Sequence, residues 1–233
     1  MTQKNKLPKF DSNGINIDDP NDTLGFKLKY ISTLQEIALK KYIGNGSGNA
    51  LDIGCAYGRM ADILYRLGYK VTGVDPAKAS IDYAMKNNPF NHTYLLGQLP
   101  NLPVSKSCFD LVCLFHIARV LHLLDIKDIC TSATEYVKPG GKLVIIDNLK
   151  LQDNKYIKPQ WFDETFERNG LKKILQVPIR SSRWPIIYLI RYGLIPERYF
   201  NQVANWELAR MAKKNKIPKL SYHNYLIMYE KQS

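Results

Sequence analysis

The 233-residue sequence lacks the features that mark secreted, membrane-spanning and metal-binding proteins. No apolar run approaches the ~20 residues that a membrane-spanning helix requires. Cysteines are few, and because their spacing fits no metal site we interpret them as thiols of a reducing compartment, three of them buried: Cys55, Cys108, Cys113 and Cys130. The lysine-rich start, residues 1–10, has no apolar run behind it, which argues against a signal peptide. These absences predict a cytoplasmic protein with no bound metal.

Acidic residues are also scarce. The chain has 21 Asp and Glu against 33 Lys and Arg, which gives a net charge of +12. Between residues 177 and 219, nine basic side chains accompany only two acidic ones. Such a segment attracts nucleic acid, a phosphorylated substrate or an anionic membrane surface equally well, so charge alone leaves the partner open.

A glycine-containing turn is the most informative segment. Residues 51–58 read Leu-Asp-Ile-Gly-Cys-Ala-Tyr-Gly, and Asp75 ends the next apolar run. Gly54 and Gly58 let backbone N–H groups approach a ligand, and a carboxylate such as Asp75 can accept hydrogen bonds from both ribose hydroxyls. The spacing differs from that of a dinucleotide site, and Asp52 would repel a phosphate but suit an amino group. We therefore expect an adenosine-bearing ligand with an amino group.

Helical and strand patterns alternate after a polar arm, residues 1–23. Alternation of this kind predicts parallel strands with helices on both faces and a ligand site at the carboxyl ends of the strands. Residues 178–218 are long for a connection and combine aromatic side chains with arginines. The expected helices cover 26–43, 59–67, 77–87, 126–137, 159–169 and 200–214, and the expected strands 50–53, 70–74, 93–96, 109–115, 142–147 and 171–177.

Together with the turn, three later segments resemble the class I S-adenosylmethionine-dependent methyltransferases. Residues 97–103 and 107–112 are similar to the family's Gly-Asp-x-x-x-Leu-Pro and Ser-Phe-Asp-Leu-Val segments, and residues 137–147 to its Leu-Lys-Pro-Gly-Gly-x-Leu strand entry. Ala56 stands where the middle glycine of the first motif is usual. The nearest likeness is to the group that includes quinone-biosynthesis and small-molecule methyltransferases.

This resemblance implies an α/β, Rossmann-like, seven-stranded and mostly parallel sheet with an antiparallel last strand over residues 222–229. We expect one methyltransferase domain, in which a helical lid is inserted and the sheet core is complete without that lid. Its parts are an N-terminal arm and helix (1–44), a cofactor-binding core (45–178), the lid (179–218) and the last strand (219–233).

The resemblance also assigns the cofactor, S-adenosylmethionine, to particular residues. Asp52 and the turn would hold its amino-acid end, Asp75 its ribose, and Pro76 would lie against the adenine. Gln98 stands where the family usually has an acid that accepts from the adenine amino group; its carbonyl can play that part. The expected cofactor-binding residues are Asp52, Gly54, Cys55, Ala56, Gly58, Asp75, Pro76, Gln98, Leu99 and Phe115.

The methyl acceptor would approach at the end of the fourth strand. There His116 is the candidate general base, because a neutral imidazole can take a proton from a hydroxyl or ammonium group. Arg119 and Arg183 could orient an anionic acceptor, and Trp184 and Tyr188 offer flat faces to it. We expect transfer to an oxygen or nitrogen of a small or medium-sized glycosyl, phenolic or phosphorylated acceptor.

Three other functions remain open at this point. A transfer-RNA base methyltransferase fits the basic balance, although no added RNA-binding domain is evident. A quinone-type C-methyltransferase could rest its lid on a membrane surface. A domain that binds the cofactor only as a partner's scaffold is the non-enzymatic alternative, against which Asp52, Gly54, Gly58 and Asp75 argue.

Overall fold

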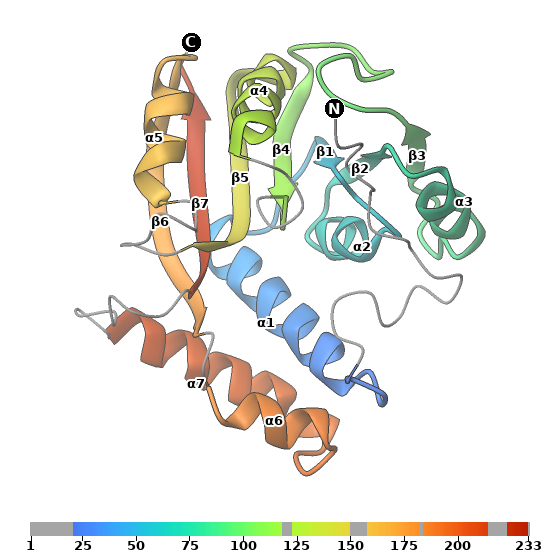
Figure 1. The fold of residues 1–233 in the computed structure, drawn as a ribbon, viewed down its shortest axis with the longest axis vertical. Coiled ribbons are helices and arrows are strands. Elements are labelled where there is room, and N and C mark those ends of the chain that lie inside the picture. The colour runs from blue at the N-terminus through green and yellow to red at the C-terminus, as the bar shows by residue number, and fades with distance from the viewer. Residues whose placement is uncertain (1–20, 118–122, 150–157, 182–183, 214–222, 233) are drawn as a thin grey trace, which may run out of the picture.

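A seven-stranded sheet with the order β3-β2-β1-β4-β5-β7-β6 forms the centre of the molecule (Figure 1). The computed structural model describes residues 21–117, 123–149, 158–181, 184–213 and 223–232. The strands are β1 (Asn49–Ile53), β2 (Lys70–Asp75), β3 (Thr93–Leu96), β4 (Phe109–Phe115), β5 (Val137–Leu149), β6 (Leu171–Ser181) and β7 (His223–Lys231).

Strand direction confirms the expected α/β fold. β1 pairs in parallel with β2 and β4, β2 with β3, and β4 with β5. β7 is antiparallel to both β5 and β6, so β6 runs in the same direction as β5. The carboxyl ends of the first six strands therefore share one edge of the sheet, where ligands bind in such folds.

Helices cover both faces of the sheet. Leu34 of α1 and Ile63 of α2 join the apolar cluster under one face with Leu111 of β4. Phe166 of α5 joins the cluster under the other face with Val112, because neighbouring strand residues point to opposite sides. The helices beside the sheet are α1 (Phe26–Tyr42), α2 (Arg59–Arg66), α3 (Lys78–Lys86), α4 (Leu123–Ala133) and α5 (Pro159–Glu167), with a 3-10 turn η1 (Thr134–Tyr136).

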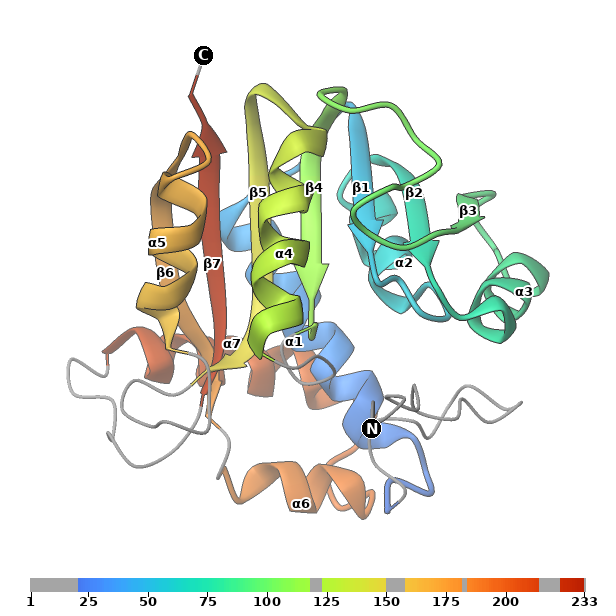
Figure 2. The same cartoon turned by 45° about the horizontal axis from the view of Figure 1, so that its top comes forward.

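The insertion after β6 is helical where it is described. It consists of α6 (Ile186–Arg191), η2 (Glu197–Tyr199) and α7 (Phe200–Lys213), which lie beside α1 at the carboxyl edge of the sheet (Figures 1 and 2). Trp184, Ile190 and Phe200 are buried in the same apolar cluster as Leu34 of α1. The expectation that the sheet core is complete without the insertion is therefore wrong.

A buried polar contact fixes α7 against α1 and β6. Glu207 of α7 is 0% exposed, and its carboxylate accepts hydrogen bonds from the Tyr30 hydroxyl (2.7 Å) and the Ser181 backbone N–H (3.2 Å). Burial raises the pKa of Glu207 to about 7, although these two donors, Arg180 and Arg210 act in the opposite direction. Tyr30 therefore serves the packing between helices.

Three boundaries differ from the sequence-based expectation. The helix expected to reach residue 137 ends earlier, because Val137 begins β5 and pairs with Phe109 across a bulge. β6 extends to Ser181, where it still pairs with β7 at His223. At the end of the expected polar arm, Asp22 is 3% exposed and accepts from the backbone N–H groups of residues 27 and 28 in the first turn of α1.

Candidate active site

The glycine turn joins the carboxyl end of β1 to α2. Gly54, Ala56 and Gly58 have φ angles of 77°, 49° and 90°, a region that glycine enters without strain. At Gly58 a side chain is excluded a second time, because a Cβ there would collide with the Tyr94 hydroxyl. Cys55, between them, is buried, and burial raises the pKa of its thiol. The turn is thus a tight backbone surface with a buried thiol beneath it.

Asp52 lies directly before this turn and is the most unusual group of the site. It is 1% exposed, and neither carboxylate oxygen has a hydrogen-bond partner within the described part of the chain. Burial raises its pKa to about 7, with Arg59 opposing the shift and Asp75 adding to it. A buried carboxylate without a donor is costly, so this geometry favours a ligand that brings a cationic or N–H group.

Asp75 ends β2 next to the turn. Its carboxylate accepts from the backbone N–H groups of Ala56 (2.9 Å) and Ala77 (2.8 Å). Burial raises the pKa of this carboxyl group, and the two N–H donors partly offset that shift. Because each carboxylate oxygen has two lone pairs, acceptor capacity remains for ligand hydroxyls.

The other expected cofactor-binding residues follow neighbouring strands at the same edge. Pro76 follows β2 and is exposed, while Phe115 ends β4 and is 6% exposed. Gln98 and Leu99 lie in the turn after β3, with Gln98 exposed and Leu99 buried. The topology therefore brings all ten residues to the carboxyl ends of β1, β2, β3 and β4, as expected for residues that surround one ligand.

His116 follows β4 and is held by a residue that the sequence analysis missed. Its Nε2 lies 2.8 Å from Nε2 of Gln35, a 0% exposed side chain of α1. The Gln35 carbonyl accepts from Arg59 (2.7 Å), which can only donate, so the Gln35 amide must donate to His116. His116 Nε2 is consequently an acceptor, and a neutral ring carries its proton on Nδ1.

This network connects three elements that meet at the glycine turn. Arg59 is the first residue of α2, directly after Gly58, and it also donates to the Ser32 hydroxyl of α1 (3.2 Å). A polar residue on the apolar side of α1 was the available sequence signal for Gln35, which lies between Leu34 and Ala38 on the buried face. Its partner could not be read from the sequence, because His116 lies 81 positions away.

A second polar group lies at the ends of β5 and β6. Asn148 of β5 is paired with Asn224 of β7, whose amide donates to the Asn148 carbonyl (3.2 Å), and Arg180 of β6 stands opposite Asn224. Asn148 is two residues beyond Ile146, whose side chain packs on the face that carries α1. These three side chains therefore extend the polar edge beyond His116, whose backbone N–H donates to Ile146 (2.8 Å).

The two expected acceptor-binding residues of the lid that the structure describes differ widely in exposure. Trp184 is 4% exposed, with its ring packed against Tyr30 (6.4 Å between centroids) and Trp206 (5.3 Å). Tyr188 is 53% exposed on α6. Trp184 thus serves core packing, which removes the support for an acceptor contact at this ring. Arg119 and Arg183 lie outside the described residues.

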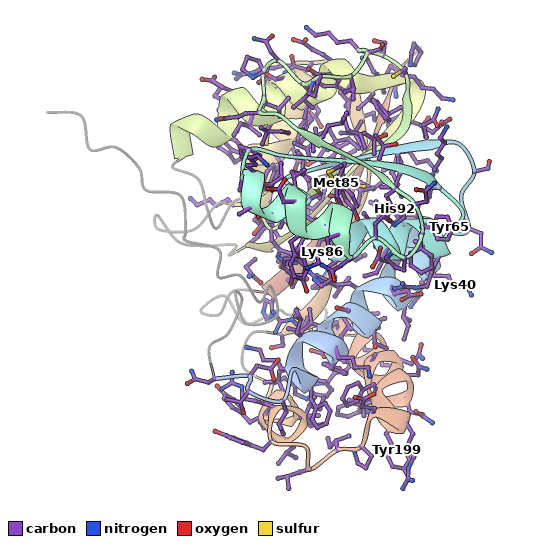
Figure 3. All side chains as sticks on the ribbon, turned by 90° about the vertical axis from the view of Figure 1, so that its right-hand side faces the viewer. Lys40, Tyr65, Met85, Lys86, His92 and Tyr199 are labelled. Atoms are coloured by element: carbon purple, nitrogen blue, oxygen red, sulfur yellow. The ribbon has the colours of Figure 1, made fainter. Side chains whose placement is uncertain are left out.

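Of the remaining histidines in the described ranges, His223 lies at the carboxyl edge of the sheet, opposite the last residues of β5 and β6, and His92 lies at the opposite edge. His92 precedes β3 at the amino edge of the sheet, beside Tyr65 (Figure 3), and pairs with Asp62 at 3.0 Å. His223 begins β7 and is 1% exposed. Over those same ranges, no cluster of three His, Cys, Asp or Glu side chains is suited to a metal ion.

Comparison with known proteins accounts for the turn and the strands that follow it. Residues 51–145 match the family described as a methyltransferase domain. This segment belongs to the class I S-adenosylmethionine-dependent methyltransferases. The methyltransferase segment begins within β1 and contains β2, β3 and β4 with the turn, Asp52, Asp75 and His116. S-adenosylmethionine is the cofactor of this family, and its ammonium and ribose hydroxyls are groups that Asp52 and Asp75 suit.

A curated relative supports the same assignment over half of the chain. The ubiquinone biosynthesis O-methyltransferase of Coxiella burnetii (strain RSA 493 / Nine Mile phase I) is 30% identical over 120 residues, which cover 50% of this chain and 47% of the relative. The chain thus matches about half the length of this relative.

Solved methyltransferase-fold structures resemble nearly the whole chain. Geranyl diphosphate C-methyltransferase from Streptomyces coelicolor A3(2) has a TM-score of 0.60 at 15% identity, covering 88% of this chain and 82% of its own. The [4+2]-cyclase SpnF has a TM-score of 0.61 at 14% identity, covering 86% and 80%. Because one is named a methyltransferase and the other a cyclase, these likenesses establish the fold and leave the reaction to the site.

Proposed function

We propose that the protein transfers the methyl group of S-adenosylmethionine to an oxygen or nitrogen of a small or medium-sized acceptor. The observation that carries this proposal is the buried carboxylate of Asp52 beside the glycine turn, which meets no hydrogen-bond donor among the described residues. An ammonium group placed there would replace the missing donor and return the carboxylate to its ionised form. The name of the Coxiella burnetii relative, an O-methyltransferase, favours oxygen as the acceptor atom.

The cofactor would be held by residues at the ends of β1, β2, β3 and β4. Asp52 and the backbone of Gly54, Cys55, Ala56 and Gly58 would receive its amino-acid part. Asp75 would receive the ribose hydroxyls. Pro76, Gln98 and Leu99 would surround the adenine, and Phe115 would lie near the sulfonium. When bound, S-adenosylmethionine supplies an electrophilic methyl group, so the protein has to align the acceptor and exclude water.

His116 would remove the proton of the acceptor. Its Nε2 accepts the Gln35 amide in the structure, so an acceptor hydroxyl must replace that amide before the nitrogen can take a proton. Gln35 is then a positioning residue that keeps the imidazole neutral and in place until the acceptor arrives. The polar edge of Asn148, Asn224 and Arg180 would face the far end of a glycosyl, phenolic or phosphorylated acceptor.

Titration calorimetry with S-adenosylhomocysteine tests the cofactor site. Asp75→Ala should weaken binding by about 1.5–3 kcal/mol, the worth of hydrogen bonds to a charged group. Asp82→Ala is the matched control, because this α3 carboxylate is exposed and pairs with Lys78. If the intact protein bound no S-adenosylhomocysteine, the methyltransferase proposal would be abandoned.

A further inference from the structure

The short helix α6 is apolar on all sides. Its inner residues Ile187 and Ile190 are 6% and 0% exposed, whereas Tyr188 and Leu189 are 53% and 43% exposed on the other side. Its one charged residue is Arg191 at the end. Helices that are apolar all round are normally covered all round. The outer side of α6 therefore has the composition of a covered surface.

The turn after α6 enlarges this exposed side. Tyr192 and Leu194 are 65% and 68% exposed, and Tyr192 shares a helix face with Tyr188 and Leu189 because it lies four and three positions beyond them. We call Tyr188, Leu189, Tyr192 and Leu194 the α6 patch. Within the described residues, six of the eleven exposed large hydrophobic side chains fall between positions 188 and 206. Such clustering marks an interaction site, unlike single exposed residues.

Basic side chains border the α6 patch. The Arg191 guanidinium lies 5.5 Å from the centre of the Tyr188 ring, and the Arg198 guanidinium 5.0 Å from the centre of the Tyr199 ring. The neighbouring acid, Glu197, forms an ion pair with Lys29 of α1. Tyrosine rings with arginine heads beside exposed leucines are the combination found where a protein meets the lipid headgroup region.

The position of α6 also suits a flat partner. The helix lies at the outer end of the molecule, beyond α1 and α7 (Figure 2), and Tyr199 of the adjoining η2 marks the same end in Figure 3. A second copy of the chain packed on this end by a two-fold axis would set arginines near arginines, whereas an anionic surface would attract them. The net charge of +12 also attracts the protein to an anionic surface.

We propose that the α6 patch docks the protein on an anionic lipid surface. The exposed leucines and tyrosines would enter the headgroup region, and the exposed Arg198 would contact lipid phosphates. The chain would lie on the surface, since no helix in the described ranges has the length and apolarity to cross a membrane. Docking does not depend on the methyl acceptor, so this proposal stands apart from the proposed function.

Flotation with lipid vesicles tests it on the full chain. We expect binding to vesicles that contain phosphatidylglycerol at least about tenfold tighter than to pure phosphatidylcholine vesicles, with a loss on adding salt. The double variant Tyr192→Ser, Leu194→Ser should lose at least about tenfold of that binding. Met85→Ser should not, because Met85 is 59% exposed on α3, far from Tyr199 (Figure 3).

Binding of S-adenosylhomocysteine by each variant shows that it remains folded. Equal retention of the double variant and the wild type on anionic vesicles would refute the patch as the docking surface. Equal binding to the two kinds of vesicle, or none, would refute the lipid partner. A wild-type dimer that Leu194→Ser converts to a monomer would instead assign the patch to a second copy of the chain.

Discussion

Ala56 replaces a glycine that is usual in the family, and its backbone conformation lowers the free energy of unfolding. It stands where a glycine is usual and has a φ of 49°, which costs an L-residue roughly 1–2 kcal/mol. Ala56→Gly removes that cost but adds about 0.5–1 kcal/mol of unfolded-chain entropy. We expect a net gain of about 0.5–1 kcal/mol in the free energy of unfolding, measured with urea.

Ala61→Gly is the control for this substitution. Ala61 is buried inside α2, only five positions away, where glycine should lower the free energy of unfolding by about 1 kcal/mol. If both variants were destabilised to the same extent, backbone strain at position 56 would not be relieved by glycine.

Asp52 should make cofactor binding depend on pH. The pKa of its carboxyl group is about 7 in the free protein, and a bound ammonium group favours the carboxylate. The complex therefore binds fewer protons than the free protein, and affinity should rise as the pH rises through about 7. Above about pH 8 the ammonium group itself is lost. Calorimetry across this range should give a bell-shaped profile with its maximum between about pH 7 and pH 8.

Asp52→Asn separates this effect from other titrations. Without the carboxylate, the acid limb of the affinity profile should flatten, and an unchanged acid limb would show that another group controls it.

The folded-state pKa of Asp52 is raised, so the stability that this group provides is greatest at low pH and is lost as the pH rises through about 7. The variant should accordingly gain stability relative to the wild type at pH 8.

At the level of elements, the lid is anchored by Trp184, which the sequence analysis predicted to contact the acceptor. Trp184 is 4% exposed between Tyr30 of α1 and Trp206 of α7. Trp184→Ala should lower the free energy of unfolding by about 3–5 kcal/mol, because it leaves a cavity where α1, α6 and α7 meet. Urea unfolding would measure this.

Trp206→Ala provides the comparison, because Trp206 is 54% exposed and stacks on the Trp184 ring. It should cost less than about 1 kcal/mol. Equal losses from the two substitutions would mean that burial of Trp184 does not hold the lid in place.

Local patterns were sufficient to predict most elements. The period of apolar residues located α1 and β4, and the resemblance predicted the antiparallel strand β7. The helix-to-β5 boundary was missed because the Pro-Gly-Gly stretch at 139–141 signals a turn, whereas β5 runs through it and Val137 already pairs with Phe109. Local residue types do not encode that pairing.

The site was predictable to the extent that its residues are neighbours in sequence or match a motif. Asp52, Gly54 and Gly58 form one turn, and Asp75 ends the next strand, so the edge they share followed from strand order. Gln35 and Glu207 were missed, because each reads as an ordinary polar residue of a helix. Their structural roles depend on His116 and Tyr30, partners on other elements that only the packing of α1 brings into contact with them.

For the whole molecule, the basic balance predicts a weak and unspecific attraction to RNA. Such binding should fall steeply with added salt as counterions are released. We expect no transfer of labelled methyl groups to bulk transfer RNA, in assays at low and at physiological salt. Label appearing in RNA would replace the small-acceptor proposal with the transfer-RNA alternative.

The contacts of α1 limit how the acceptor preference of one enzyme can be transferred to a related enzyme. One side of α1 presents Gln35 to His116 and Arg59, while Tyr30 on the same helix is bonded to Glu207 of the lid. The helix α1 and the lid therefore form a single unit, although Tyr30 and Glu207 lie 177 positions apart in the sequence. A chimera that borrowed residues 184–213 alone would set a foreign lid against a native helix. Successful grafts should carry residues 26–42 along with the lid.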